Sequence, residues 1–306
     1  MSEKIIQTFR KVILSGQFIL GQEVLKFEKE VSAFYKTKYA VGVNSGTDAL
    51  WLSLKALGIK NGDEVITTPF TFVSPSEVIA QCGARPVFVD INYNDFLINV
   101  KEIEKAITKK TKAIIPVHLF GQCCDMDGIM KLARKYNLKV IEDGAQAFGN
   151  MKIGKGDLLC FSFHPSKSLG ACGDGGMVLT DNLEHYKILQ SLRNHGADLS
   201  KGKLGKYHNL RIGFNSRLDE IQAAILRVKL KDFGKGGIKR LYTFRVDEKI
   251  RNRFVKQLEK MGLDVKIYYS KLLHLLPVFK YLGYKKGDFP IAEQSAKECL
   301  TVNVYD

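Results

Sequence analysis

Between residue 27 and about residue 180, short runs of apolar and β-branched residues alternate with longer amphipathic stretches. The short runs are almost continuously apolar, which is typical of strands buried on both faces of a parallel sheet. Alternation of such strands with helices predicts an α/β domain with a largely parallel sheet. The expected strands are 39–43, 64–68, 86–90, 112–117, 139–143, 159–163 and 176–180, and clear helices are expected at 49–57 and 126–136.

A glycine-rich break over 234–237 follows an expected helix at 218–231. Glycine favours loops over regular elements, so this break is the best candidate for a domain boundary. A strand at 242–246 and a helix at 249–261 are expected beyond it. We therefore predict a large α/β domain over 1–232 and a smaller α+β domain over 233–306, a division that suits a chain of 306 residues.

Composition and charge narrow the class of protein. Hydrophobic residues make up 45% of the chain, and 47 Lys and Arg against 32 Asp and Glu give a net charge of +15. The lysines are scattered over helical faces without a nucleic-acid-binding motif, so we expect no nucleic-acid partner, although the charge suits a phosphate-bearing substrate. No apolar run approaches the ~20 residues that span a bilayer, and the N-terminus is polar, so we expect a cytoplasmic protein without a membrane segment. No Cys or His spacing indicates a metal site.

Polar residues follow several expected strands, where α/β proteins bind ligands. Ser45, Gly46 and Thr47 connect a strand to a helix, and the N–H groups of such a turn attract an anion, most often a phosphate; the alternative is a simple helix cap. Asp143 ends the strand at 139–143, where it either caps the next turn or faces a buried cation. By themselves these motifs leave both alternatives open.

The segment after the strand at 159–163 carries a lysine among hydroxyl groups. Lys167 follows Ser162 closely, and a desolvated lysine at such a place can act as an amine nucleophile. Ser162 stands where its hydroxyl could hold a phosphate. The alternative for Lys167 is an ordinary solvated loop lysine.

Six ordered blocks together resemble the DegT/StrS family of pyridoxal-phosphate sugar aminotransferases, which have the aspartate-aminotransferase-like fold (fold type I). The resemblance covers nearly the whole chain. It implies pyridoxal 5′-phosphate as the cofactor and transamination as the reaction. The blocks are 44–50, 68–73, 116–122, 141–147, 162–167 and 215–224.

The resemblance also implies a role for each matching residue. Lys167 would form the internal Schiff base and then move the proton between the substrate carbon and the cofactor. Asp143 would pair with the pyridinium nitrogen and keep it protonated. Gln146 would hydrogen-bond the phenolic oxygen, and Phe72 would stack on the ring.

The phosphate and the subunit arrangement follow from the same resemblance. The backbone amides of Gly46 and Thr47 and the Ser162 hydroxyl would hold the phosphate. Asn215 would reach the phosphate from a neighbouring subunit, which implies a homodimer with shared active sites. His164 and His195 lie in family-like blocks and are weaker candidates for substrate contacts.

Four stretches depart from the family pattern. The segment at 148–156 is short, and the helix ending near 231 gives way to glycines where relatives continue it. The chain also ends at Asp306, where relatives usually run on, so we expect a shortened small domain. Tyr268-Tyr269-Ser270 stands where the family usually has His-Tyr-Pro.

The leading hypothesis is an aminotransferase that uses glutamate to aminate a nucleotide-linked keto sugar, a thymidine-diphosphate 3-keto-6-deoxyhexose in particular. The 3-position is favoured because Ser216 stands where many 4-keto enzymes have Tyr; a small Ser216 beside Asn215 could leave room for the sugar, or it could simply pack. The alternatives are amination of a 4-keto sugar linked to thymidine or uridine diphosphate, and a cofactor-binding protein with weak or regulatory activity. A dehydratase activity is a further alternative. Dehydratases of the same family have His at the position of Lys167, so the lysine argues against this alternative.

Overall fold

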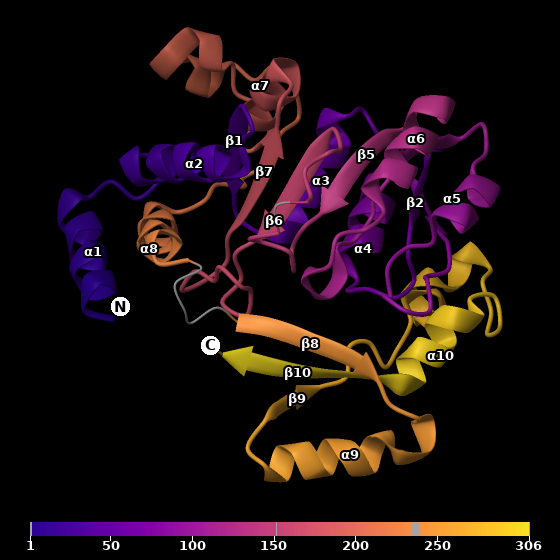
Figure 1. Cartoon of the computed structure of the whole chain (residues 1–306). Coiled ribbons are helices and arrows are strands. Elements are labelled where there is room, and N and C mark those ends of the chain that lie inside the picture. The colour runs from indigo at the N-terminus through magenta and orange to yellow at the C-terminus, as the bar shows by residue number, and fades with distance from the viewer. Residues whose placement is uncertain (1, 151, 234–238, 306) are drawn as a thin grey trace.

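The computed structural model describes residues 2–150, 152–233 and 239–305. Its strands form a seven-stranded sheet and a three-stranded sheet, which lie one above the other in Figure 1. The glycine-rich break expected to separate two domains falls at 234–238, outside the described residues. The division into 1–232 and 233–306 therefore stays a proposal.

The large sheet is mostly parallel, as the sequence predicts. Neighbouring strands run parallel from β6 to β3, whereas β7 is antiparallel to both β1 and β6. All seven expected strands are present, several of them trimmed at their ends. Their order across the sheet is β1 (Tyr39–Val43), β7 (Gly176–Thr180), β6 (Leu158–Ser162), β5 (Lys139–Asp143), β4 (Thr111–Ile114), β2 (Glu64–Thr67) and β3 (Arg85–Phe88).

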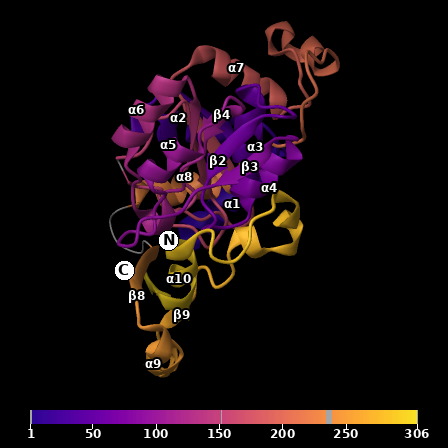
Figure 2. The same ribbon diagram turned by 90° about the vertical axis from the view of Figure 1, so that its right-hand side faces the viewer.

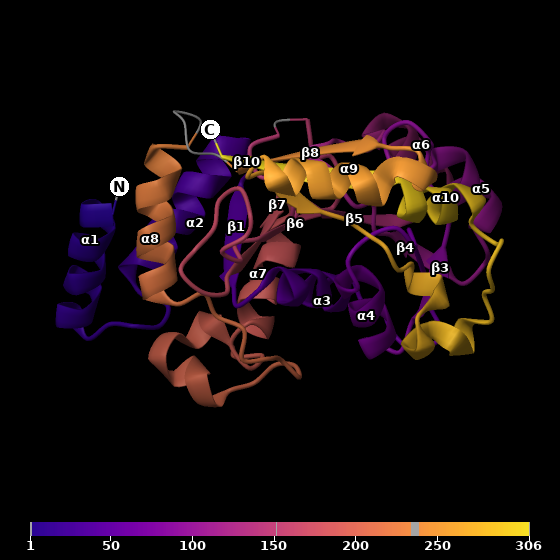
Figure 3. The same cartoon turned by 90° about the horizontal axis from the view of Figure 1, so that it is seen from below.

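Helices bury both faces of this sheet, which explains why the central positions of its strands are apolar. In β6, Leu158 and Cys160 pack into one hydrophobic cluster, while Leu159 and Phe161 pack into another on the opposite face. The helices of the large unit are α1 (Ser2–Ser15), α2 (Gln22–Tyr35), α3 (Gly46–Ala56), α4 (Ser74–Gln81), α5 (Val100–Ala106), α6 (Met126–Tyr136), α7 (Leu183–Leu192) and α8 (Glu220–Lys231), with 3-10 turns η1 (Leu119–Gly121) and η2 (Leu199–Tyr207). Figure 3 shows α1 beside α8 at one end of the molecule, and Figure 2 shows the salmon-coloured segment around η2 projecting from the body.

The C-terminal unit is a small antiparallel sheet with one helix on its outer face. Its strand order is β8 (Lys239–Arg245), β10 (Cys299–Tyr305) and β9 (Asp264–Lys266). Leu300 and Val302 point toward α9 (Glu248–Lys260) and pack with Phe254, while Leu241 on β8 faces the large unit. Figure 1 shows α9 on the side of this sheet that faces away from the large unit. The remaining elements are η3 (Leu273–Leu275), η4 (Pro277–Leu282) and α10 (Pro290–Glu298).

The C-terminal unit is packed firmly on the large unit. One hydrophobic cluster contains Phe88 of β3 together with Phe279 and Phe289 of the C-terminal unit. The Asp90 carboxylate accepts the N–H groups of Ile291 and Ala292 at the start of α10, each at 2.9 Å. These contacts hold the C-terminal residues in place against the sheet edge. Among the described residues, no helix is both long enough and apolar enough to span a membrane.

Candidate active site

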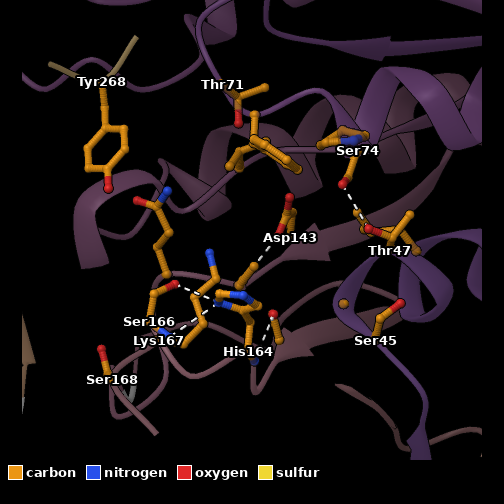
Figure 4. Close-up of a pocket in the computed structure, with 18 of the residues that line it drawn as sticks. Ser45, Thr47, Thr71, Ser74, Asp143, His164, Ser166, Lys167, Ser168 and Tyr268 are labelled. Carbon is orange, nitrogen blue, oxygen red and sulfur yellow. Dashed lines mark hydrogen bonds between the residues drawn. The ribbon is translucent and has the colours of Figure 1, made fainter. Parts of the chain in front are cut away.

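A pocket of about 360 Å³ lies at the carboxyl ends of β5 and β6. The N-terminus of α3, the loop after β6 and the C-terminal unit complete its walls, as Figure 4 shows. Every catalytic or cofactor-binding residue expected from the sequence lines this pocket except Asn215. The pocket therefore brings together Gly46, Thr47, Phe72, Asp143, Gln146, Ser162 and Lys167.

One end of the pocket is built to receive an anion. Ser45 caps α3 by accepting the Asp48 N–H at 3.0 Å, and the helix then begins at Gly46. A Cβ at Gly46 would lie only 2.6 Å from the Cβ of Ser162, so glycine is required for this close approach. The approach puts the first N–H groups of α3 beside the Ser162 hydroxyl, where the helix dipole also favours negative charge. Capping and anion binding, which were alternatives in the sequence, are thus compatible.

Asp143 is a buried carboxylate at the end of β5. One of its oxygens accepts the Ala145 N–H at 3.0 Å. Burial raises the pKa of Asp143, and the Ala145 N–H and the positive charges of Lys167 and His118 offset only part of this effect. A cation bound in the pocket would stabilise the ionised carboxylate, since opposite charge and desolvation act in opposite directions on its pKa.

The Gln146 side chain is held at both ends of its amide. Its Oε1 accepts the Phe120 N–H at 2.8 Å, and its Nε2 donates to the Tyr269 hydroxyl at 3.1 Å. Because the Phe120 N–H can only donate, it must face Oε1, which fixes the orientation of the amide. Nε2 carries a second hydrogen, which can serve a ligand in the pocket.

Lys167 lies in the turn that follows β6. Its backbone N–H donates to His164 O at 2.8 Å, and Figure 4 shows Lys167 on the same loop as His164 and Ser166. The positive charge of Lys167 lowers the pKa of Asp143, which means that the amine and the carboxylate interact electrostatically across the pocket. A solvated surface lysine would not have this effect on a buried group.

Phe72 supplies an apolar surface in the pocket wall. Its side chain is 59% exposed, unusual for a phenylalanine beside a buried strand end. A flat aromatic ligand would cover this ring by stacking.

The residues present fit pyridoxal 5′-phosphate. The cluster around Gly46 and Ser162 suits a phosphate, the Asp143 carboxylate suits a pyridinium nitrogen, and the Lys167 amine suits an aldehyde. Among the residues that the structure describes, no cluster of His, Cys, Asp and Glu could hold a metal ion.

Two of the remaining candidates lie outside the pocket. Asn215 is exposed, and its backbone forms a bridge with Asn194. His195 is also exposed, with a positive φ of 58°, and its N–H donates to Phe214 O. His164 does line the pocket, where its Nδ1 contacts the Ser166 hydroxyl at 2.8 Å.

The interpretation of Ser216 as a residue that leaves room for the sugar is wrong. Ser216 is completely buried, and its hydroxyl donates to Asp48 Oδ2 at 2.6 Å and accepts the Asn44 N–H at 3.2 Å. These bonds tie the start of α3 to the segment before α8. The packing alternative is therefore the one that the structure supports.

The sequence analysis missed the pocket residues of the C-terminal unit. Tyr268 and Tyr269 line the pocket, and Figure 4 shows the Tyr268 ring extending toward the loop of Ser166 and Lys167. The departure of this stretch from the family pattern was the only signal in the sequence. Thr71 and Ser74 were also missed; the Ser74 hydroxyl lies 2.8 Å from that of Thr47.

The shortened segment before β6 is anchored from inside the protein. The buried Glu142 contacts His118 Nε2 at 2.7 Å and accepts the N–H groups of Gly154 and Gly156. Burial alone would raise the pKa of Glu142, but these hydrogen bonds hold its pKa below the usual value. The short loop therefore stays fixed to β5 directly behind Asp143.

Three comparisons relate the chain to known proteins. A family model described as the DegT/DnrJ/EryC1/StrS aminotransferase family matches residues 1–240 and 231–306. A UDP-2-acetamido-2-deoxy-3-oxo-D-glucuronate aminotransferase of Pseudomonas aeruginosa is 44% identical over 340 residues, covering 100% of this chain and 92% of the relative. A protein of Geobacillus stearothermophilus named a pleiotropic regulatory protein is 39% identical, covering 100% and 90%. The crystal structure of NtdA from Bacillus subtilis with bound cofactor PMP superposes with a TM-score of 0.90 at 31% identity, covering 99% of this chain and 77% of that chain.

Proposed function

Because the chain belongs to the DegT/DnrJ/EryC1/StrS aminotransferase family, we propose that it transfers an amino group from glutamate to carbon 3 of a nucleotide-linked keto sugar. The family, the fold, the enzyme class and the pyridoxal phosphate cofactor expected from the sequence are confirmed. The two matched parts of the chain overlap at 231–240, where the sequence indicates a shortened segment. The substrate, the donor and the residue roles below are proposals.

The cofactor, when bound, supplies an electron sink for the substrate carbon. The first N–H groups of α3 and the Ser162 hydroxyl hold its phosphate, and Phe72 stacks on its ring. Asp143 binds the ring nitrogen and keeps it protonated. Gln146 Nε2 donates to the phenolic oxygen.

Lys167 performs the covalent and proton-transfer steps. Its Nζ would hold the cofactor through the aldehyde carbon, and the same amine, once the substrate amine has taken its place, would take and return the proton at the substrate carbon. The observation that carries the proposal is the geometry of one pocket, which is lined together by Lys167, the buried Asp143 and the N-terminus of α3.

The position of amination is supported by the relative from Pseudomonas aeruginosa, whose named substrate has its oxo group at carbon 3. That relative uses a uridine nucleotide, so we favour uridine diphosphate over the thymidine diphosphate expected from the sequence. Both nucleotides belong in the test.

The substrate proposal predicts one regiochemical outcome. Incubation with glutamate and separately prepared 3-keto and 4-keto sugars, linked to uridine or thymidine diphosphate, is expected to aminate only 3-keto substrates. NMR of the products locates the nitrogen. Attachment at carbon 4 alone would refute the 3-keto proposal and leave the aminotransferase assignment intact.

We also propose a homodimer with shared sites and a cytoplasmic location. Asn215 does not line the pocket of its own chain, and it lies beside exposed apolar residues, Ile212 at 95% and Phe214 at 48% exposure. A second copy that covered these side chains would bury apolar surface and bring Asn215 toward the neighbouring pocket.

Shared sites predict complementation between inactive variants. Lys167→Ala and Asn215→Ala homodimers are each expected to lose most activity, whereas mixing them should restore part of it. One of the two sites in a heterodimer then holds both natural residues. The measurement is activity after subunit exchange, with exchange verified by differently tagged chains; absence of recovery would contradict shared sites.

A weak or regulatory activity is the second candidate, favoured by the name of the Geobacillus relative. The half-reaction with glutamate separates the two. An aminotransferase converts the bound cofactor to its amine form, which removes the visible absorbance. A protein that only binds the cofactor keeps that absorbance.

A further inference from the structure

We propose that Tyr269 of the C-terminal unit is a positioning residue that orients the Gln146 amide toward the cofactor. This inference rests on the proposed contact between Gln146 and the phenolic oxygen. Tyr269 itself does not need to touch the cofactor for this role.

The Gln146 amide makes two hydrogen bonds inside the protein. Nε2 donates to the Tyr269 hydroxyl at 3.1 Å, and Oε1 accepts the Phe120 N–H at 2.8 Å. Exchanging the two ends of the amide would place the Nε2 donor against the Phe120 N–H donor. The Phe120 N–H thus defines which atom of Gln146 is the donor, and the bond to the Tyr269 hydroxyl holds that donor end in place in the pocket wall.

The position of Tyr269 is itself fixed by packing. Its ring meets Phe70 edge to face, with 6.0 Å between the ring centres. Burial raises the pKa of Tyr269 above its ordinary value, so its phenol stays neutral at working pH. The phenol is therefore held in the pocket wall by its packing on Phe70, and it presents its hydroxyl to the Gln146 side chain.

Loss of the hydroxyl should loosen Gln146 without removing it. In Tyr269→Phe the ring can keep its packing on Phe70, but Nε2 loses its acceptor. Only the Phe120 N–H then holds the amide, so its Nε2 end moves more freely about the χ3 torsion and spends less time as a donor to the phenolic oxygen. A donor there stabilises negative charge on that oxygen and weakens its hold on a neighbouring proton.

The test compares Tyr269→Phe with Tyr284→Phe. Tyr284 is a matched control because its hydroxyl accepts the Phe88 N–H at 3.2 Å, which also joins the C-terminal unit to the large unit but outside the pocket. Titration of the cofactor-free proteins with pyridoxal phosphate is expected to show an affinity about 10-fold lower for Tyr269→Phe, the effect of one net hydrogen bond, and no change for Tyr284→Phe. In the loaded protein, the pH midpoint of the visible absorbance should rise by about one unit in Tyr269→Phe alone.

A double-mutant cycle with Gln146→Leu decides whether Tyr269 acts through Gln146. The expected result is that Tyr269→Phe has no further effect on affinity or on the midpoint once Gln146 is replaced. An undiminished effect in the Gln146→Leu background would overturn the proposal, as would an unchanged Tyr269→Phe single variant. If Gln146→Leu itself binds the cofactor normally, the proposed role of Gln146 fails instead, so the two failures are distinguishable. Thermal unfolding of each cofactor-free variant checks that the fold is intact.

Discussion

Replacing Lys167 with alanine is expected to lower turnover by more than about 10³-fold, because one amine supplies both the covalent bond to the cofactor and the proton transfer. Noncovalent binding of the cofactor should persist, since the phosphate contacts at Gly46 and Ser162 and the carboxylate of Asp143 are untouched. The measurement is steady-state transamination together with the visible spectrum.

Borohydride reduction makes the Lys167 prediction specific. Reduction of the loaded natural protein followed by peptide mapping should give a pyridoxyl label on Lys167. Lys155→Ala is a suitable control, because Lys155 lies outside the pocket and pairs with Asp127 at 2.7 Å. A label on any other lysine, or loss of activity in the control alone, would contradict the assignment.

Replacing Asp143 with asparagine is expected to lower turnover by roughly 10²-fold or more, since a buried pyridinium would lose its counter-charge and tend to deprotonate. The amide keeps the size of the side chain and can still accept the Ala145 N–H. Asp125→Asn is the matched control: Asp125 caps α6 by accepting the Gly128 N–H at 3.0 Å and lies outside the pocket. Equal, near-natural activities in both variants would mean that Asp143 is only a cap.

The same substitution should affect stability in the opposite direction from activity. Burial raises the pKa of Asp143 in the folded protein, so protons bind the folded state more tightly than the unfolded state at this group. The resulting stabilisation is present at low pH and is lost as pH rises through the folded-state pKa. At neutral pH the ionised carboxylate therefore lowers the free energy of unfolding of the cofactor-free protein. Cofactor-free Asp143→Asn should melt at or above the natural temperature, as calorimetry can measure, whereas a lower melting temperature would contradict the argument.

The strands and the residues at their ends were predictable because their signals are local. A run such as 158–161 is apolar at successive positions, and that pattern indicates burial on both faces. Asp143 and Ser162 follow from the same pattern, because the end of a buried parallel strand defines where a polar side chain meets the pocket. The resemblance of six ordered blocks then added Phe72, Gln146 and the family, which periodicity does not contain.

The contacts between distant segments were decided only by the tertiary structure. The sequence does not indicate that Gly46 packs closely against Ser162. It also does not indicate that Gln146 and Tyr269 share a hydrogen bond. The sequence also left two roles open for Ser216, making room for the sugar or packing in the protein. Its complete burial and its hydrogen bond to Asp48 favour packing. Local pattern determines which elements form and which face is apolar, because those depend on neighbouring residues. Which side chains meet across the pocket depends on how the elements pack, and packing is a property of the whole folded chain.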